Sequence, residues 1–276
     1  MLCVPTPDAV HSWVGKDLVA GVDLDVLALD RGRVRMKTAE ARALGREIRA
    51  LVKDDEIEVA YARLAPVLAE RTPFRLLGLI GEAIGAEPLA PVNAFLDRIA
   101  SEKTEGGWVV IGTALGQQFD RDLSGAFARA RRTIIAADVW YGADIIGERV
   151  PGPALVSRFE PALALLEPWR RDANVWVRRA VGVAVHFWTK RSRGVESLVP
   201  QAHTLLGFLE PMVEEWEMAA AKGVGWGLKT LGKYYPDLLV AWLPRQLSRR
   251  HRAVIERKAL TYLSEAQTRR VLEGVG

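Results

Sequence analysis

Two side chains that could act together on a reacting cation stand four residues apart, at Trp140 and Asp144. On a helix this spacing places both on one face, within reach of each other. An indole face stabilises a nearby positive charge by about 0.5–2 kcal/mol, and a carboxylate adds to this while holding a water molecule. Such a pair could therefore serve a transient cation, but by itself it proves nothing, because a lone tryptophan and aspartate at this spacing are more often a core residue and a solvated charge.

Other familiar catalytic groups are missing from the sequence. It contains no glycine-rich phosphate loop and no serine or cysteine nucleophile in a recognisable turn. The single cysteine, Cys3, cannot form an internal disulfide, and the four histidines stand too far apart for a ligand motif. We therefore expect chemistry based on carboxylates and aromatic rings, with no cofactor and no metal.

Helices must position these residues, because apolar residues recur at helical spacing along nearly the whole chain. Ala41, Leu44, Ile48 and Leu51 form one such series, and no stretch alternates convincingly with period two. Prolines mostly fall between the helical segments or in their first turn. The predicted helices span residues 38–53, 56–71, 73–85, 91–103, 107–119, 122–137, 138–149, 152–167, 173–189, 195–208, 211–222, 224–234, 236–248, 250–262 and 265–274.

Helices of this length with wide apolar faces favour an all-α, HEAT-like repeat solenoid, an α-α superhelix, over a closed bundle. No strict sequence period accompanies them, so periodicity alone leaves a compact helical domain open. No linker divides the chain, which predicts a single domain over residues 1–276 with an irregular lead-in over residues 1–36. Ser264 and Gln267 predict a capping box at the start of the last helix.

Positive charge is concentrated in the C-terminal part of the chain. Residues 168–276 contain 18 Lys and Arg against 10 Asp and Glu, a net charge of +8 that leaves −4 for residues 1–167. Because arginine binds phosphate through two donors at once, we expect this part to face a polyanion. The sequence has neither a secretory signal pattern nor an apolar run as long as a membrane span, which predicts an intracellular protein without a membrane partner.

Three segments resemble, in order and spacing, the signature segments of the AlkD-type DNA alkylation repair family. They are ADVWYGADIIG (137–147), DANVWVRRAVGVAV (172–185) and KGVGWGLKTLGKYYPD (222–237), and the resemblance is best over residues 137–262. It implies a HEAT-like solenoid with a concave basic DNA-binding face. It also implies a glycosylase that excises N3- and N7-alkylpurines from duplex DNA without a base-flipping pocket.

The resemblance also assigns roles to residues. It implies that Trp140 and Asp144 are catalytic, that Trp226 is a second tryptophan of the cleft, and that Arg179 binds the DNA backbone beside the lesion. We expect further DNA contacts from basic residues, namely Arg178, Lys222, Lys229, Lys233, Arg249, Arg250 and Arg252. Trp176, Trp188 and His186 are interpreted as core residues, with His186 hydrogen-bonded.

The sequence departs from the family pattern at two of these positions. Val139 stands where members often have a first tryptophan, but Trp140 keeps the spacing to Asp144. Lys229 stands where arginine is usual, which keeps the charge and loses the planar fork. These departures bear on the range of substrates more than on the chemistry.

An alkylated purine is already cationic, so its departure needs no general acid, and the positive sugar left behind suits two indoles and one carboxylate. The expected partner is double-stranded DNA containing alkylated bases, and the protein is expected to be a monomer in the cytoplasm, associated with the nucleoid. Two alternatives stay open. One is a non-catalytic HEAT-like protein that binds damaged or branched DNA, and the other is a HEAT-like protein scaffold.

Overall fold

Residues 36–275 are described by the structure, a computed structural model. Every regular element among them is a helix, which confirms the predicted all-α class. The predicted irregular lead-in over residues 1–36 lies, except for Met36, outside the described residues. None of the described helices is long and apolar enough to cross a membrane.

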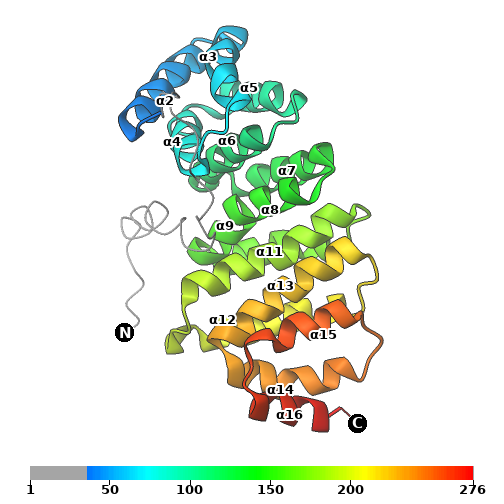
Figure 1. The fold of residues 1–276 in the computed structure, drawn as a ribbon. Helices are drawn as coiled ribbons and strands as arrows, with labels where there is room; N and C mark the ends of the chain where they lie inside the picture. The colour runs from blue at the N-terminus through cyan, green and yellow to red at the C-terminus, as the bar shows by residue number, and fades with distance from the viewer. Residues whose placement is uncertain (1–35, 276) are drawn as a thin grey trace, which may run out of the picture.

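The helices stack in two layers (Figure 1). Each helix of the first layer packs on the next helix of the same layer. Their order is α2 (Thr38–Lys53), α4 (Phe74–Gly85), α6 (Glu105–Gly116), α8 (Trp140–Arg149), α11 (Val175–Ser192), α13 (Met218–Tyr234) and α15 (Ala253–Ala259). The second layer contains α3 (Ile57–Ala69), α5 (Leu89–Ser101), α7 (Phe119–Ala137), α10 (Phe159–Leu166), α12 (Val199–Leu209), α14 (Pro236–Leu247) and α16 (Glu265–Glu273). A row of stacked helix pairs is a helical-repeat solenoid, as predicted.

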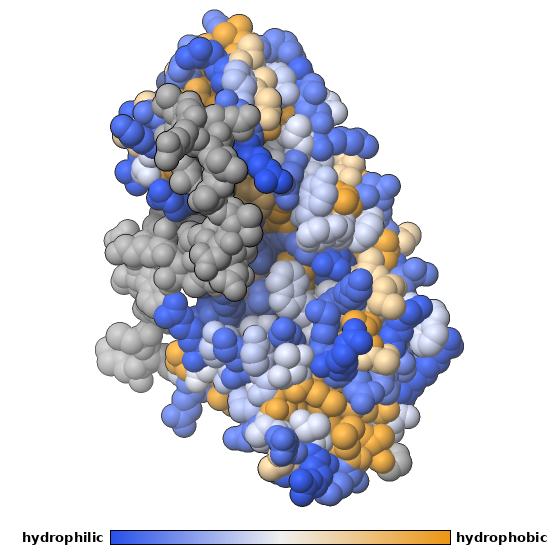
Figure 2. All heavy atoms as spheres, viewed as in Figure 1, coloured by the Kyte–Doolittle hydropathy of each residue, from blue (hydrophilic) through white to orange (hydrophobic). Residues whose placement is uncertain are grey.

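Shorter elements join these helices. The helix α9 (Pro151–Ser157) follows α8 directly and packs on α11, and four short 3-10 helices are η1 (Glu167–Arg171), η2 (Glu196–Leu198), η3 (Glu210–Met212) and η4 (Leu260–Tyr262). Figure 2 shows one face of the molecule covered mainly by hydrophilic side chains, with a group of hydrophobic ones toward the C-terminal end. The apolar periodicity seen in the sequence faces inward, and Trp188 is buried in the core as predicted. Trp176, also predicted as a core residue, is only half-buried, because its Nε1 reaches the surface and donates to Asp138 at 2.9 Å.

Neighbouring helices of the first layer run parallel. On α8 and α11, Asp144 pairs with Arg179 and Gly147 lies against Val183. On α11 and α13, Arg179 reaches Ala219, and further along both helices His186 stacks on Trp226. Residue numbers rise together in each pair of helices, so equivalent positions of successive repeats can be matched.

The helices α11 and α13 pack with their backbones close together at glycines. A Cβ atom added to Gly182 would collide with the carbonyl group of Gly223. The predicted break between residues 222 and 224 is therefore wrong, because α13 runs unbroken through Gly223 and Gly225. These glycines serve close helix packing rather than chain reversal.

Other predicted helices differ from the observed ones. The segment 152–167 is split at Arg158, whose backbone is not helical (φ −146°, ψ 59°). The cause is Pro161, because a proline ring clashes with the carbonyl four residues earlier and so favours a helix start just before it. The helix α7 begins at Phe119, but its backbone is not helical at Asp122 (φ −158°, ψ 79°), so the predicted helix start at residue 122 corresponds to a kink within α7. The predicted helix over residues 211–222 is wrong over residues 213–217, which are not helical. At the C-terminus the capping box of Ser264 and Gln267 is present as predicted.

Candidate active site

Asp144 and Arg179 form the best-defined ion pair of the candidate site. The Asp144 carboxylate accepts hydrogen bonds from Arg179 Nε at 2.7 Å and Arg179 Nη2 at 2.8 Å. Arg179 Nη1 also donates to the backbone carbonyl of Ala219 at 3.2 Å. One guanidinium thus joins α8, α11 and α13, and it fixes the orientation of the carboxylate in a bidentate geometry.

The start of α11 is built so that Arg179 is held in place. Asn174 precedes the helix, and its side-chain oxygen accepts from the backbone N–H groups of Trp176 and Val177. The side chains of Arg179 and Asp144 are only 10% and 13% exposed, so the pair is largely buried but still reaches solvent. A charged pair in this position costs desolvation free energy that its hydrogen bonds must offset.

Trp140 is the first residue of α8, one turn before Asp144, as the spacing predicted. Its side chain is 57% exposed, which is unusual for a tryptophan, and its ring stands edge-on to Tyr141 with the ring centroids 5.6 Å apart. The exposed indole and the fixed carboxylate therefore occupy the same end of α8.

Trp226 lies further along the same surface. Its ring stacks on His186 with centroids 4.2 Å apart, and His186 Nδ1 lies 2.6 Å from the hydroxyl oxygen of Thr230. Trp226 follows Ala219 by seven residues, which is about two helical turns on α13. Along the parallel helices, Trp140 comes before the Asp144–Arg179 pair and Trp226 comes after it, and we call these residues the row.

Lysines of α13 and α15 lie beside this row. Lys222 and Lys233 are exposed, and the ammonium groups of Lys229 and Lys233 lie 5.1 and 5.3 Å from the centre of the Tyr262 ring. Burial lowers the pKa of Lys258, and the nearby charges of Lys229, Arg179 and Lys222 lower that pKa further. Cations are therefore crowded beside the row, an arrangement that attracts an anion.

The predicted arginine contacts are divided among different roles. Arg178 pairs with Glu215 at 2.7 Å, and Arg249 pairs with Glu214 and Glu210, so carboxylates neutralise both. Arg250 and Arg252 instead lie over the ring of Trp216. The structure brings Arg179 and the lysines to the row of Trp140 and Asp144, whereas it places the other arginines at the edge of the first layer.

Sequence reasoning missed one ionisable residue in this region and one contact. Glu148 follows Asp144 by one turn on α8, and burial raises its pKa, while the charges of Arg149 and Lys190 oppose that rise. His186 is buried and hydrogen-bonded, which confirms the prediction of a core residue, but its stacking on Trp226 was not expected. The spacing of Glu148 from Asp144 was the available signal for the first. The pairing of His186 with Trp226 depends on helix register and had no local signal.

As the pH is lowered from about 6.5 to 3, the free energy of unfolding is expected to decrease, and it should decrease more steeply for the wild type than for His186→Gln. Burial, together with the nearby charges of Lys190, Lys229 and Lys258, lowers the pKa of His186 from 6.5 to about 3. The unfolded chain therefore takes up a proton in this window that the folded protein excludes, which costs about 1.4 kcal/mol per pH unit.

Urea unfolding at several pH values measures this dependence. His203→Gln is the matched control, because His203 is exposed. Its unfolding profile is expected to follow that of the wild type. Equal slopes for the wild type and His186→Gln would contradict the buried neutral state of His186.

The two-layer row of helices, with a carboxylate, indoles and cations on successive first-layer helices, defines an all-helical repeat protein with a charged candidate site. A family model described as DNA alkylation repair enzyme matches residues 94–263. This is more than half of the chain, so the chain belongs to that family. No curated protein and no solved structure matches it. Membership gives the protein a role in DNA repair, with DNA as its partner.

Proposed function

We propose that the protein is a DNA glycosylase that hydrolyses the N-glycosidic bond of cationic N3- and N7-alkylpurines in duplex DNA, without a base-flipping pocket. The observation that carries this proposal is the Asp144 carboxylate, which is fixed by two hydrogen bonds from Arg179 one turn from the exposed ring of Trp140. A protein that only binds DNA has no need of a carboxylate beside a polyanion, because like charges repel.

The reaction needs stabilisation of positive charge more than proton transfer. The bond between the sugar C1′ and the purine nitrogen breaks, its electron pair neutralises the alkylated base, and the sugar is left as an oxocarbenium ion. A water oxygen then bonds to C1′ and releases its proton to solvent. Asp144 holds this water and, with the indole face of Trp140, stabilises the developing cation.

Arg179 has two functions in this proposal. Its three hydrogen bonds, to Asp144 and to the carbonyl of Ala219, use fewer donors than a guanidinium carries. The remaining N–H groups can bind a phosphate oxygen of the lesion-bearing strand, which brings the sugar close to Asp144. Lys222, Lys229 and Lys233 bind neighbouring phosphates, and Trp226 on its His186 support closes the far end of the row.

Release of 7-methylguanine and 3-methyladenine from alkylated duplex DNA by the wild-type protein tests the proposal. We expect both bases to be released without added metal. A protein that releases neither base, yet binds duplex DNA with an affinity that falls steeply as salt rises, is a binding protein for damaged DNA. A protein that shows neither release nor salt-dependent binding is a scaffold. Either result would reject the glycosylase.

A further inference from the structure

An exposed tryptophan outside the proposed catalytic row stands at the edge of the first layer. Trp216 lies between η3 and α13, and its side chain is 48% exposed. Scattered exposed apolar side chains are ordinary on protein surfaces. Trp216 differs from these because the chain on both sides of it is fixed and because two arginines lie over its ring.

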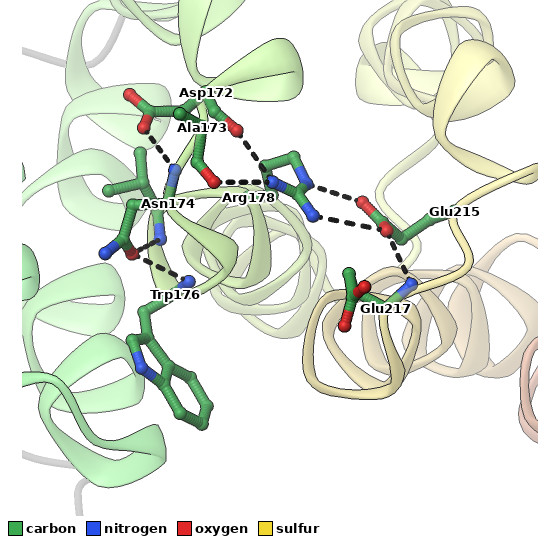
Figure 3. A network of polar contacts seen from close by, with 8 residues as sticks. Asp172, Ala173, Asn174, Trp176, Arg178, Glu215 and Glu217 are labelled. Carbon is green, nitrogen blue, oxygen red and sulfur yellow. Dashed lines mark hydrogen bonds and ion pairs between the residues drawn. The ribbon is translucent and has the colours of Figure 1, made fainter.

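The chain around Trp216 is held by the network drawn in Figure 3. The Glu215 carboxylate accepts from Arg178 Nε at 2.7 Å and from the backbone N–H of Glu217 at 2.8 Å. Arg178 in turn donates to the backbone carbonyls of Asp172 at 2.7 Å and of Ala173 at 3.2 Å. These bonds tie the residues on either side of Trp216 to the start of α11. The backbone on both sides of the exposed indole is therefore fixed before a ligand binds, which lowers the entropy cost of binding.

Positive charge lies directly against this indole. The guanidinium carbons of Arg250 and Arg252 lie 4.1 and 4.8 Å from the ring centroid. Arg252 Nε is buried without a hydrogen-bond partner in the described part of the chain. Two of the acids nearest in sequence are paired with other arginines, Glu214 with Arg249 and Glu215 with Arg178. The surface therefore combines a flat π-system with two cations.

Tryptophans occur near the starts of three successive first-layer helices. Trp140 is the first residue of α8, Trp176 is the second residue of α11, and Trp216 lies two residues before α13. Because these helices are parallel, their starts lie along one edge of the first layer, which we call the tryptophan edge. Of these three residues, Trp176 is partly buried and its Nε1 donates to Asp138 at 2.9 Å, whereas the side chains of Trp140 and Trp216 are exposed.

We propose that Trp216, with Arg250 and Arg252, binds an unpaired nucleotide of DNA at the tryptophan edge. Unpaired bases stack on indole rings and on guanidinium planes without regard to sequence, and arginine binds the adjoining phosphate. A fully paired base offers no free face to such a ring. The proposal requires DNA as the partner, and it is independent of the glycosylase reaction.

Binding to a short oligothymidylate and to a blunt-ended DNA duplex of equal length, whose bases are all paired, tests the proposal. Trp216→Leu keeps an apolar side chain without a π-face, and we expect it to weaken binding to the single strand about tenfold and binding to the duplex by less than about twofold. Trp216→Phe restores most of the lost affinity because the ring remains. Leu272→Ala, at an equally exposed apolar side chain on α16, is the control and leaves both affinities unchanged.

Three results would overturn the proposal. These are equal losses on both DNAs with Trp216→Leu, no loss on the single strand, and no binding of oligothymidylate by the wild type. Circular dichroism checks that each variant folds. Excision from fully paired alkylated DNA is measured separately, so a wild type that fails to excise rejects the glycosylase and leaves the result at the tryptophan edge intact.

Discussion

Replacement of Asp144 by asparagine is expected to lower the single-turnover rate of 7-methylguanine release at least about a hundredfold. Asparagine keeps the shape of the side chain and removes the negative charge that faces the developing sugar cation. It also leaves the Arg179 guanidinium opposite a neutral amide, so the net charge beside the cation becomes positive. The rate is measured with protein in excess over alkylated duplex, which separates the chemical step from product release.

Asp97→Asn provides the matched control for this experiment. Asp97 also pairs with an arginine, Arg129 at 3.1 Å, but its side chain is 69% exposed and lies on α5 of the second layer. Its loss is expected to leave the excision rate unchanged, because an exposed pair contributes little to stability. Equal rates for Asp144→Asn and the wild type would remove Asp144 from the mechanism.

Gly182→Ala is expected to lower the free energy of unfolding by roughly 1–3 kcal/mol. The added methyl group has no room, because its Cβ atom would overlap the backbone carbonyl of Gly223, and backbone cannot rotate away as a side chain can. The helices α11 and α13 must separate to accept it, which also disturbs the stack of His186 on Trp226. Urea denaturation measures the loss.

The same substitution at Gly207 should have the opposite sign. Gly207 lies inside α12, and a Cβ atom placed there meets nothing within 4 Å. Alanine is expected to stabilise the protein by about 0.5–1 kcal/mol, because it loses less backbone entropy than glycine on forming a helix. A Gly182→Ala protein as stable as Gly207→Ala would show that the close packing of α11 on α13 is not required.

Much of the fold follows from local sequence. Apolar spacing and prolines predicted the all-helical class and most helices, and the capping box at Ser264 appears as expected. The main failure was α13, where glycines were interpreted as a break. Their role depends on contacts with the neighbouring helix α11, which lies about 40 residues earlier in the sequence. A pattern within one helix cannot predict such contacts.

The candidate site was predictable in its types of residue and less so in its contacts. The four-residue spacing correctly placed Trp140 and Asp144 on one helix face, and the catalytic roles stay predictions. The bidentate pairing of Asp144 with Arg179 depends on the register of two helices, which no spacing within one helix reveals. Trp216 was overlooked because the sequence placed it inside a predicted helix over residues 211–222, whereas residues 213–217 are not helical. Its exposure and its contacts with Arg250 and Arg252 depend on the tertiary structure and had no local signal.

The first layer is a row in which each helix contacts mainly its neighbours, so its stability resembles that of a one-dimensional chain. Fraying starts at the two ends of such a chain and reaches its middle last. The bonds of Arg179 to Asp144 and Ala219 lie on α8, α11 and α13, with further repeats on either side. Amide hydrogens of α11 should therefore exchange most slowly, so that the terminal repeats can open and close around a lesion while the carboxylate keeps its place.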